Sequence, residues 1–305
     1  MTSSRAAAAT EPEYELAEGI VWDDRAALVR WVDIWKGRVL SGALRDGGIA
    51  DIAVTEIGQT AGAVALAEDG GLLVAGTRGL VAISPDGVLS SGPDLLGERR
   101  DVRFNDGRAD PHGRFVVGTM ALGDASGEEV LLRVHTDGGV ETLRDGLGLS
   151  NGIAFSADGG TIYHVDTEAG TVSSHSYGPG AFDRAEPWAT ALADLPAPPD
   201  GIAVDAEGAL WVAQWGGSSV RRHAPTGELL QIVEVDAAQV SCPGFVGPDL
   251  DVLAITTAQE GLDEVTDQAG AIFLADVGGA GQPPLRWAGS TSAPWWLRDG
   301  QEEGA

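Results

Sequence analysis

The sequence predicts an all-β fold, a six-bladed β-propeller with four antiparallel strands in each blade. Three observations support this prediction. A short pattern, in which one residue precedes a glycine and an apolar run, recurs six times at intervals of roughly 45 residues. Turn signals that contain Asp-Gly or Gly-Gly separate the apolar runs along the whole chain. No stretch long enough for a helix shows helical periodicity. This period, with several strands in each repeat, is typical of a propeller blade.

Each copy of the repeat marks the start of the innermost strand that we expect in one blade. The six copies lie at 18–21, 61–64, 106–109, 151–154, 200–203 and 243–246. Tight turns follow them, because Asp-Gly tolerates the positive φ angles that hairpins require. The runs between the turns are short and rich in branched or aromatic side chains, as expected for strands. Examples are 72–75, 115–118, 161–165 and 210–213.

The repeats occupy nearly all of the 305 residues, which favours a single domain. We expect the propeller to span residues 14–290, with a flexible N-terminal tail at 1–13 and a C-terminal tail at 291–305. A propeller has to close into a ring so that no sheet edge is left open. We expect residues 14–16 to close it by pairing near residues 285–288 in the last blade.

Composition excludes several classes of partner. The net charge of −27 would repel phosphate backbones, so nucleic-acid binding is not expected. The single cysteine, Cys242, excludes an internal disulfide and is expected to pack in the core. The chain lacks both a signal-peptide pattern and an apolar run long enough to span a membrane. We therefore expect a cytoplasmic protein without a membrane partner, and the sequence does not indicate its oligomeric state.

Four of the residues that precede the repeat glycines have oxygen-bearing side chains, namely Glu18, Asp106, Asn151 and Asp200. Repeat symmetry places equivalent positions around one central channel. A turn does not explain why Glu18, Asn151 and Asp200 stand directly before apolar inner strands. Carboxylate and amide oxygens are hard donors that suit Ca²⁺, Mg²⁺ or Mn²⁺. The sequence therefore predicts a divalent metal site in the central channel, with positions left open for water and substrate.

A dense polar run at 103–107, Arg-Phe-Asn-Asp-Gly, occupies the same level of another blade. Arg103 offers a forked donor to an anionic or hydroxylated ligand, and Asn105 can donate to a carbonyl or hydroxyl group. A surface ion pair with a turn is the alternative interpretation. The absence of a Gly-x-Ser-x-Gly elbow, a phosphate loop and a dinucleotide fingerprint disfavours serine hydrolases and nucleotide-dependent enzymes. Whether His164 or Trp215 lines the pocket stays open.

Segments across residues 16 to about 290 resemble, in the same order, the gluconolactonase, regucalcin and luciferin-regenerating-enzyme family. The segments are 16–23 (LAEGIVWD), 103–107 (RFNDG), 118–120 (GTM), 149–154 (LSNGIA), 199–205 (PDGIAVD), 210–213 (LWVA), 215–217 (WGG) and 247–251 (GPDLD). The resemblance implies a metal held by Glu18, Asn151 and Asp200, substrate binding by Arg103 and Asn105, and hydrolysis of sugar lactones. The chain departs from the family at 121–123, where an acidic residue is usual, and at His164, where an apolar residue is usual. These departures leave the substrate open.

We therefore expect a divalent-metal-dependent hydrolase, a lactonase that opens a sugar (aldono-)lactone with a metal-activated water. Asp200 would act as the general base while Arg103 and Asn105 hold the substrate. Ca²⁺ is the expected cofactor, and Mg²⁺, Mn²⁺ and Zn²⁺ are the alternatives. Two other functions stay open at this point. One is a non-catalytic propeller that binds metal or ligand, and the other is a related metal-dependent esterase that acts on a non-sugar substrate.

Overall fold

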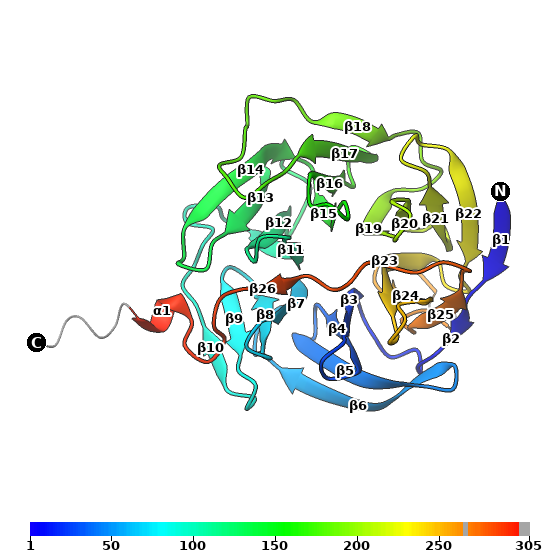
Figure 1. The fold of residues 1–305 in the computed structure, drawn as a ribbon, viewed down its shortest axis with the longest axis horizontal. Helices are drawn as coiled ribbons and strands as arrows, with labels where there is room; N and C mark the ends of the chain where they lie inside the picture. Colours follow the sequence, from blue (N-terminus) through cyan, green and yellow to red (C-terminus); the bar gives the residue numbers. More distant parts are fainter. Residues whose placement is uncertain (265–267, 299–305) are drawn as a thin grey trace, which may run out of the picture.

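Six small β-sheets are arranged around a central channel in the computed structural model, which describes residues 1–264 and 268–298 (Figure 1). The predicted six-bladed β-propeller is therefore confirmed. Within a blade, successive strands run antiparallel from the channel outward. The first three blades are β3 (Ala17–Asp23), β4 (Leu28–Asp33), β5 (Arg38–Arg45), β6 (Gly48–Glu56); β7 (Ala63–Ala67), β8 (Leu72–Ala75), β9 (Leu80–Ile83), β10 (Leu89–Ser91); and β11 (Val102–Ala109), β12 (Phe115–Ala121), β13 (Glu129–Val134), β14 (Val140–Leu147).

The other three blades follow in the same order around the ring. They are β15 (Ser150–Phe155), β16 (Thr161–Asp166), β17 (Thr171–Ser176), β18 (Ala189–Leu192); β19 (Pro199–Val204), β20 (Leu210–Gln214), β21 (Ser219–His223), β22 (Leu229–Glu234); and β23 (Gln239–Val246), β24 (Val252–Ala258), β25 (Phe273–Asp276). The last blade obtains its fourth, outermost strand from the N-terminus. This strand is β2 (Ala7–Ala8), which pairs antiparallel with β25.

Ring closure differs from the sequence-based expectation. The expected pairing of residues 14–16 with residues 285–288 is wrong, because Leu16 forms a bridge with Ala258, while β26 (Arg286–Trp287) pairs parallel with β7. Residues 1–13, expected to form a loose tail, contain β2 and also β1 (Thr2–Arg5), which pairs parallel with β22. The physical reason is that β25 and β22 would each present a free edge, and the N-terminal segment satisfies the backbone groups there.

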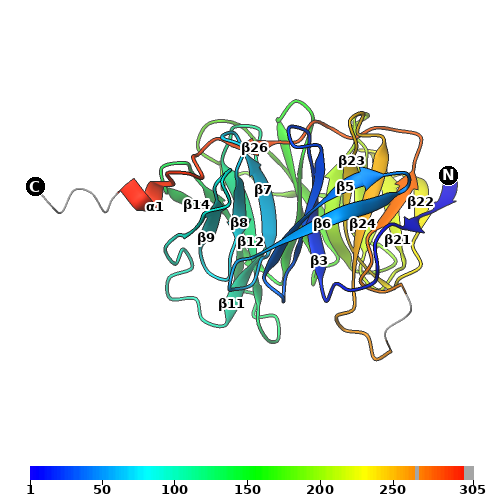
Figure 2. The ribbon, with the colours of Figure 1, turned by 90° about the horizontal axis from the view of Figure 1, so that it is seen from below.

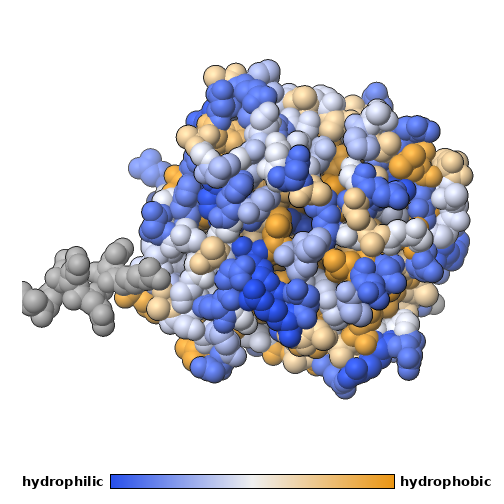
Figure 3. Space-filling model, viewed as in Figure 1, coloured by the Kyte–Doolittle hydropathy of each residue, from blue (hydrophilic) through white to orange (hydrophobic). Residues whose placement is uncertain are grey.

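The C-terminal part of the chain crosses one face of the ring. Residues 277–285, here called the crossing segment, lead from β25 across the channel to β26 (Figure 1). The side view shows this segment on one face and the loop at 259–264 on the opposite face (Figure 2). On the face of the crossing segment, hydrophobic residues form only small areas among hydrophilic ones (Figure 3).

The chain ends in a short helix beyond the ring. Helix α1 (Trp295–Arg298) belongs to the expected C-terminal tail, whose residues 299–305 lie outside the described part of the chain. Within the described residues, no helix has the length and apolar character needed to cross a membrane.

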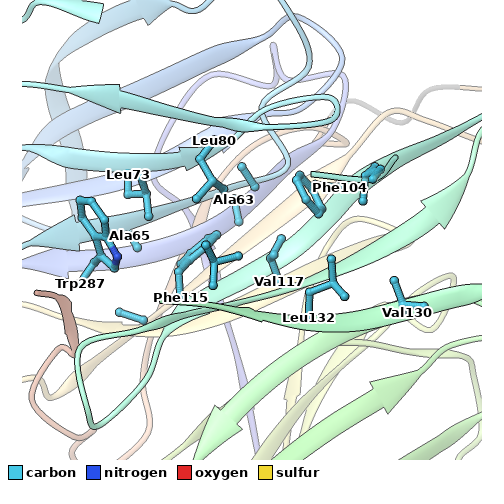
Figure 4. Packing of buried hydrophobic residues seen from close by; sticks show 14 of the residues in the cluster. Ala63, Ala65, Leu73, Leu80, Phe104, Phe115, Val117, Val130, Leu132 and Trp287 are labelled. Atoms are coloured by element: carbon cyan, nitrogen blue, oxygen red, sulfur yellow. The ribbon is translucent and has the colours of Figure 1, made fainter. Parts of the chain in front are cut away.

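Apolar side chains fill the space between neighbouring blades. Between the second and third blades, Phe104 and Phe115 pack with Leu73 and Leu80, and all four side chains are buried (Figure 4). Burial of such a side chain stabilises the fold by about 1.5–3 kcal/mol. Phe104 lies inside the polar run at 103–107, so this packing also fixes the position of the polar residues on either side of it. Cys242 is buried in another such cluster, as expected.

The recurring X-Gly pattern marks a bulge in the inner strand. The pairing register shifts at this pattern in β3, β11, β15, β19 and β23. A bulge re-aims the side chains beside it, and Glu18, Asn151 and Asp200, which each precede the glycine, line one cavity in the channel. The glycine permits close approach of the next blade, because a Cβ on Gly152 would lie 2.5 Å from the carbonyl oxygen of Asp200. The repeat thus encodes both the tight ring and its polar centre.

Candidate metal centre and substrate pocket

One cavity of about 470 Å³ brings together all five residues that the sequence singled out. It lies at the end of the channel where the inner strands begin, on the face opposite the crossing segment. Glu18 comes from β3, Arg103 and Asn105 come from β11, Asn151 comes from β15 and Asp200 comes from β19. Four blades therefore contribute to a single pocket, although their residues are far apart in the chain.

The three expected metal ligands are buried, and each takes part in a hydrogen bond with the protein. The amide nitrogen of Asn151 donates a hydrogen bond to Asp200 Oδ1, and it also lies 3.3 Å from Thr167 Oγ1. The Thr167 hydroxyl in turn donates to the carbonyl oxygen of Pro199 at 2.8 Å. Glu18 Oε2 accepts a hydrogen bond from its neighbouring Gly19 amide at 2.9 Å. These contacts join the inner ends of the fourth and fifth blades and hold the ligand side chains in place.

Three carboxylates lie buried in the channel, Glu18 and Asp200 in this pocket and Asp106 in the wall of a small cavity at the other end. Burial, together with the nearby charge of Asp106, raises the pKa of Glu18 from its ordinary value of 4.5 to about 8. Burial raises the pKa of Asp200 well above its usual range, and the charges of Glu18 and Asp106 raise it further. Burial also raises the pKa of Asp106. Among the described residues, the ion pairs include none of these three carboxylates. Their hydrogen-bond partners include the neutral amides of Gly19, Gly107 and Asn151.

The donor set fits a hard divalent cation. Two carboxylates and one amide supply only oxygen ligands, which suit Ca²⁺, Mg²⁺ or Mn²⁺ better than softer metals. A bound cation would also compensate the buried negative charge, which is costly when it is unpaired. Within residues 1–264 and 268–298, no three His, Cys, Asp or Glu side chains converge closely enough to hold a metal. A cation here would therefore depend on the amide oxygen of Asn151 as its third protein ligand.

Arg103 and Asn105 form a rigid donor pair beside the carboxylates. Arg103 is 1% exposed, and its Nη1 donates to the Phe104 carbonyl oxygen at 2.9 Å and to Asn105 Oδ1 at 2.8 Å. Its guanidinium lies over the ring of Trp35, 4.8 Å from the ring centroid. Burial lowers the pKa of Arg103 to about 10, so the side chain stays charged at neutral pH. The amide nitrogen of Asn105 donates to the Ser150 carbonyl oxygen at 3.2 Å.

Several pocket residues lie outside the repeat pattern, which is why sequence reasoning missed them. Thr167 and Glu168 follow β16, and Glu260 follows β24. Trp35, which does not line the cavity but stacks on Arg103, lies in the connection between β4 and β5. The positions of loop residues depend on how the loops pack, so the strand repeat does not reveal them. Trp215, which the sequence left open, lines the cavity.

His164, which the sequence also left open, is fully buried behind the cavity wall rather than in it.

The opposite end of the channel is covered. A small cavity of about 90 Å³ lies there between Asp106, Arg108 and the crossing segment. That segment is held by a bridge between Gly281 and Asp205 and by a hydrogen bond from Gln282 Nε2 to the Asp205 carbonyl oxygen at 3.2 Å. A ligand therefore reaches the carboxylates from the face where the inner strands begin.

Comparison with known proteins shows which family this chain resembles. The model of the SMP-30/Gluconolactonase/LRE-like region matches residues 16–259. The chain is 37% identical over 281 residues to a pentonolactonase of Haloferax volcanii, covering 89% of this chain and 94% of that protein. It is 32% identical to a 6-deoxy-6-sulfogluconolactonase of Pseudomonas putida, covering 86% and 91%.

A solved structure shows the same architecture. It is that of regucalcin, named as a calcium-binding protein, from Agrobacterium tumefaciens, with 27% identity and a TM-score of 0.84 over 94% of this chain and 99% of that one. The family model covers most of the propeller, and the sequence resemblance noted above is confirmed. The chain therefore belongs to the SMP-30/gluconolactonase/LRE-like family.

Proposed function

We propose that this chain is a divalent-metal-dependent lactonase that hydrolyses a sugar lactone to the open-chain sugar acid. The observation that carries the proposal is the single cavity in which two buried carboxylates without an ion pair and an amide face a charged Arg103–Asn105 donor pair. The lactonase names of the relatives support the reaction class. The similarity to regucalcin, named as a calcium-binding protein, supports calcium as the metal.

Glu18, Asn151 and Asp200 would hold the metal in this proposal. Once bound, a divalent cation supplies Lewis-acid polarisation of a carbonyl and lowers the pKa of a nearby water. Ca²⁺ is the first candidate because all donors are hard oxygens, and Mg²⁺, Mn²⁺ and Zn²⁺ are the alternatives.

The protein's own side chains would orient the lactone and move one proton. Arg103 and Asn105 donate to the ring oxygens and hydroxyl groups, which fixes the carbonyl carbon in front of the attacking water. Asp200 accepts a proton from that water as its oxygen adds to the carbonyl carbon. The ring C–O bond then breaks as Asp200 returns this proton to the leaving ring oxygen. The products are a hydroxyl group and a carboxylic acid, which releases one proton to become a carboxylate.

The pocket walls fit a ring with one polar face. Leu16, Ile34 and Met120 line the cavity and can pack against ring carbons, whereas the donor pair faces the oxygens. A cavity of about 470 Å³ also accommodates a monosaccharide lactone.

A non-catalytic calcium-binding role is the second candidate, since the similar solved structure is that of a protein named as calcium-binding. An assay of chelated protein distinguishes the lactonase from the non-catalytic binding role. The protein is tested on five- and six-membered sugar lactones and a simple ester, with Ca²⁺, Mg²⁺, Mn²⁺ or Zn²⁺ added back. A pH indicator follows the released proton. If the protein hydrolyses lactones of one ring size, and only after metal is added back, the result supports the lactonase proposal. Metal binding without turnover of any compound would favour the binding role.

A further inference from the structure

His164 occupies a central strand of the fourth blade, where a buried imidazole needs hydrogen-bond partners. It lies in β16 and is fully buried. Its Nε2 is 2.8 Å from Ser150 Oγ on the adjacent inner strand, and its Nδ1 is 3.2 Å from Arg144 Nη1 on β14 of the third blade. The imidazole therefore joins two blades directly behind the pocket wall.

Chemistry fixes the direction of these two hydrogen bonds. A guanidinium nitrogen can only donate, so Nδ1 of His164 must be the unprotonated acceptor. The proton of the neutral ring then resides on Nε2, which donates to Ser150 Oγ. Burial and the charge of Arg144 lower the pKa of His164 well below its ordinary range, which agrees with a neutral ring. The ring thus has one defined tautomer with both nitrogens used.

Ser150 connects His164 to the two substrate donors in the pocket. Its carbonyl oxygen accepts from the Asn105 amide at 3.2 Å, and Asn105 Oδ1 accepts from Arg103 Nη1 at 2.8 Å. On its other side, Ser150 packs against β12, where a Cβ at Gly118 would lie only 2.0 Å from Ser150 Oγ. Ser150 is therefore held by His164 on one side and by β12 on the other, and it directly precedes Asn151. Two hydrogen-bonded groups therefore meet at Ser150. Arg144 and His164 hold its side chain, and Asn105 and Arg103 are linked to its backbone carbonyl.

We propose that His164 is a positioning residue for the substrate donors, acting through Ser150 on the amide of Asn105. The proposal rests on the function proposed above for what Asn105 and Arg103 bind, but its geometry does not depend on that function. Without His164, the Ser150 hydroxyl loses the hydrogen bond that His164 donates to it. The Ser150 carbonyl oxygen, which accepts from Asn105, can then move, and Arg103 and Asn105 lose their fixed orientation. A family member with an apolar residue at this position would lack this control.

The test compares alanine, a conservative replacement and a matched buried histidine. Glutamine carries an acceptor and a donor side by side, so His164→Gln can keep both contacts, whereas His164→Ala removes both. Ser150→Ala removes only the acceptor atom and serves as the second variant if His164→Ala does not fold. His175→Gln is the control, because His175 is also buried in this blade but bonds to the carbonyl oxygens of Ser176 and Glu186, away from the pocket residues.

The expected kinetic result is a rise in KM without a comparable loss of kcat. In His164→Ala and Ser150→Ala, KM for the lactone rises about three- to tenfold and kcat stays within about twofold, because hydrogen bonds to the substrate are weakened equally in the ground state and the transition state. His164→Gln restores KM to near the wild-type value, and His175→Gln lowers the Tm without changing KM. Loss of Tm in His164→Ala with an unchanged KM, or failure of His164→Gln to rescue KM, would overturn the proposal.

A spectroscopic readout tests the same proposal without turnover. The side-chain amide signals of Asn105 should shift in His164→Ala and stay in place in His164→Gln and His175→Gln. The nitrogen signals of His164 should show the Nε2-protonated neutral ring at about pH 6, below the ordinary histidine pKa. If wild-type protein hydrolyses no lactone but these signals behave as stated, the proposed function fails and the positioning role stands. Unshifted Asn105 signals in His164→Ala refute the positioning role.

Discussion

The buried carboxylates make the stability of the metal-free protein depend on pH in an unusual direction. Most acidic groups in folded proteins have lowered pKa values and stabilise the fold as pH rises. Glu18 is the opposite case, because burial and Asp106 raise its pKa to about 8. A group whose pKa is higher in the folded state stabilises that state below its unfolded pKa. This stabilisation is lost as pH rises through the folded pKa. Glu18 should therefore weaken metal-free protein between pH 4.5 and about pH 8.

The size of the effect follows from the displacement of this pKa. One pKa unit corresponds to about 1.4 kcal/mol, so the change from 4.5 to about 8 amounts to on the order of 5 kcal/mol across the full range. The slope is about 1.4 kcal/mol per pH unit within the window. Asp200 and Asp106, whose pKa values are also raised, act in the same direction. His164 acts oppositely only below its unfolded pKa of about 6.5, because its pKa is lowered.

Urea unfolding of chelated wild-type protein and Glu18→Gln from pH 5 to pH 9 isolates the contribution of Glu18. Glutamine mimics the protonated side chain, so the variant should become more stable than wild type by an amount that grows with pH. Added Ca²⁺ should reverse this trend in wild-type protein alone, since metal binds the deprotonated ligands. A constant difference between the two proteins from pH 5 to pH 9 would refute the reasoning about buried, uncompensated charge.

Three further changes have defined outcomes. Glu260→Gln should raise kcat/KM for a sulfonated or phosphorylated lactone about fivefold relative to a neutral lactone at low salt. The reason is that Glu260 lines the pocket and its negative charge repels an anionic substrate. The increase should be smaller at high salt, which screens this repulsion. Glu228→Gln, on the far face, should leave that ratio unchanged, and an equal change in both variants would contradict the pocket argument. Arg103→Lys should raise KM about tenfold in lactone kinetics because lysine lacks the forked donor. Gly152→Ala should destabilise the fold by about 1–3 kcal/mol in urea unfolding, since its Cβ would overlap a neighbouring carbonyl; full stability would show that the blades relax easily.

The sequence predicted the centre of this molecule better than its periphery, for a physical reason. Glu18, Asn151 and Asp200 occupy equivalent repeat positions, and the symmetry of a propeller converts equivalent positions into neighbours around one axis. The bulge at each X-Gly pair adds the orientation, because it aims the preceding side chain at the channel. Sequence spacing alone therefore contained the geometry of these residues.

Trp35 and Glu260 were not predictable in the same way. Both lie in loops between strands, and their approach to Arg103 depends on how each loop packs over the pocket. Ring closure was also missed, because β1 and β2 are very short and consist of polar residues and alanine, with no apolar alternation to mark them. Their pairing follows from the free edges of β22 and β25, which only the assembled fold reveals.

The most direct test of the central claim is to measure calcium binding and lactone turnover on the same chelated samples of wild-type protein and Asp200→Ala. Calorimetric titration gives the stoichiometry, and a pH indicator gives the rate at each calcium concentration. We predict one bound ion per chain in wild-type protein, turnover that rises in parallel with occupancy, and the loss of both in Asp200→Ala. Full turnover in chelated wild-type protein, or in Asp200→Ala, would contradict a metal centre built on Glu18, Asn151 and Asp200.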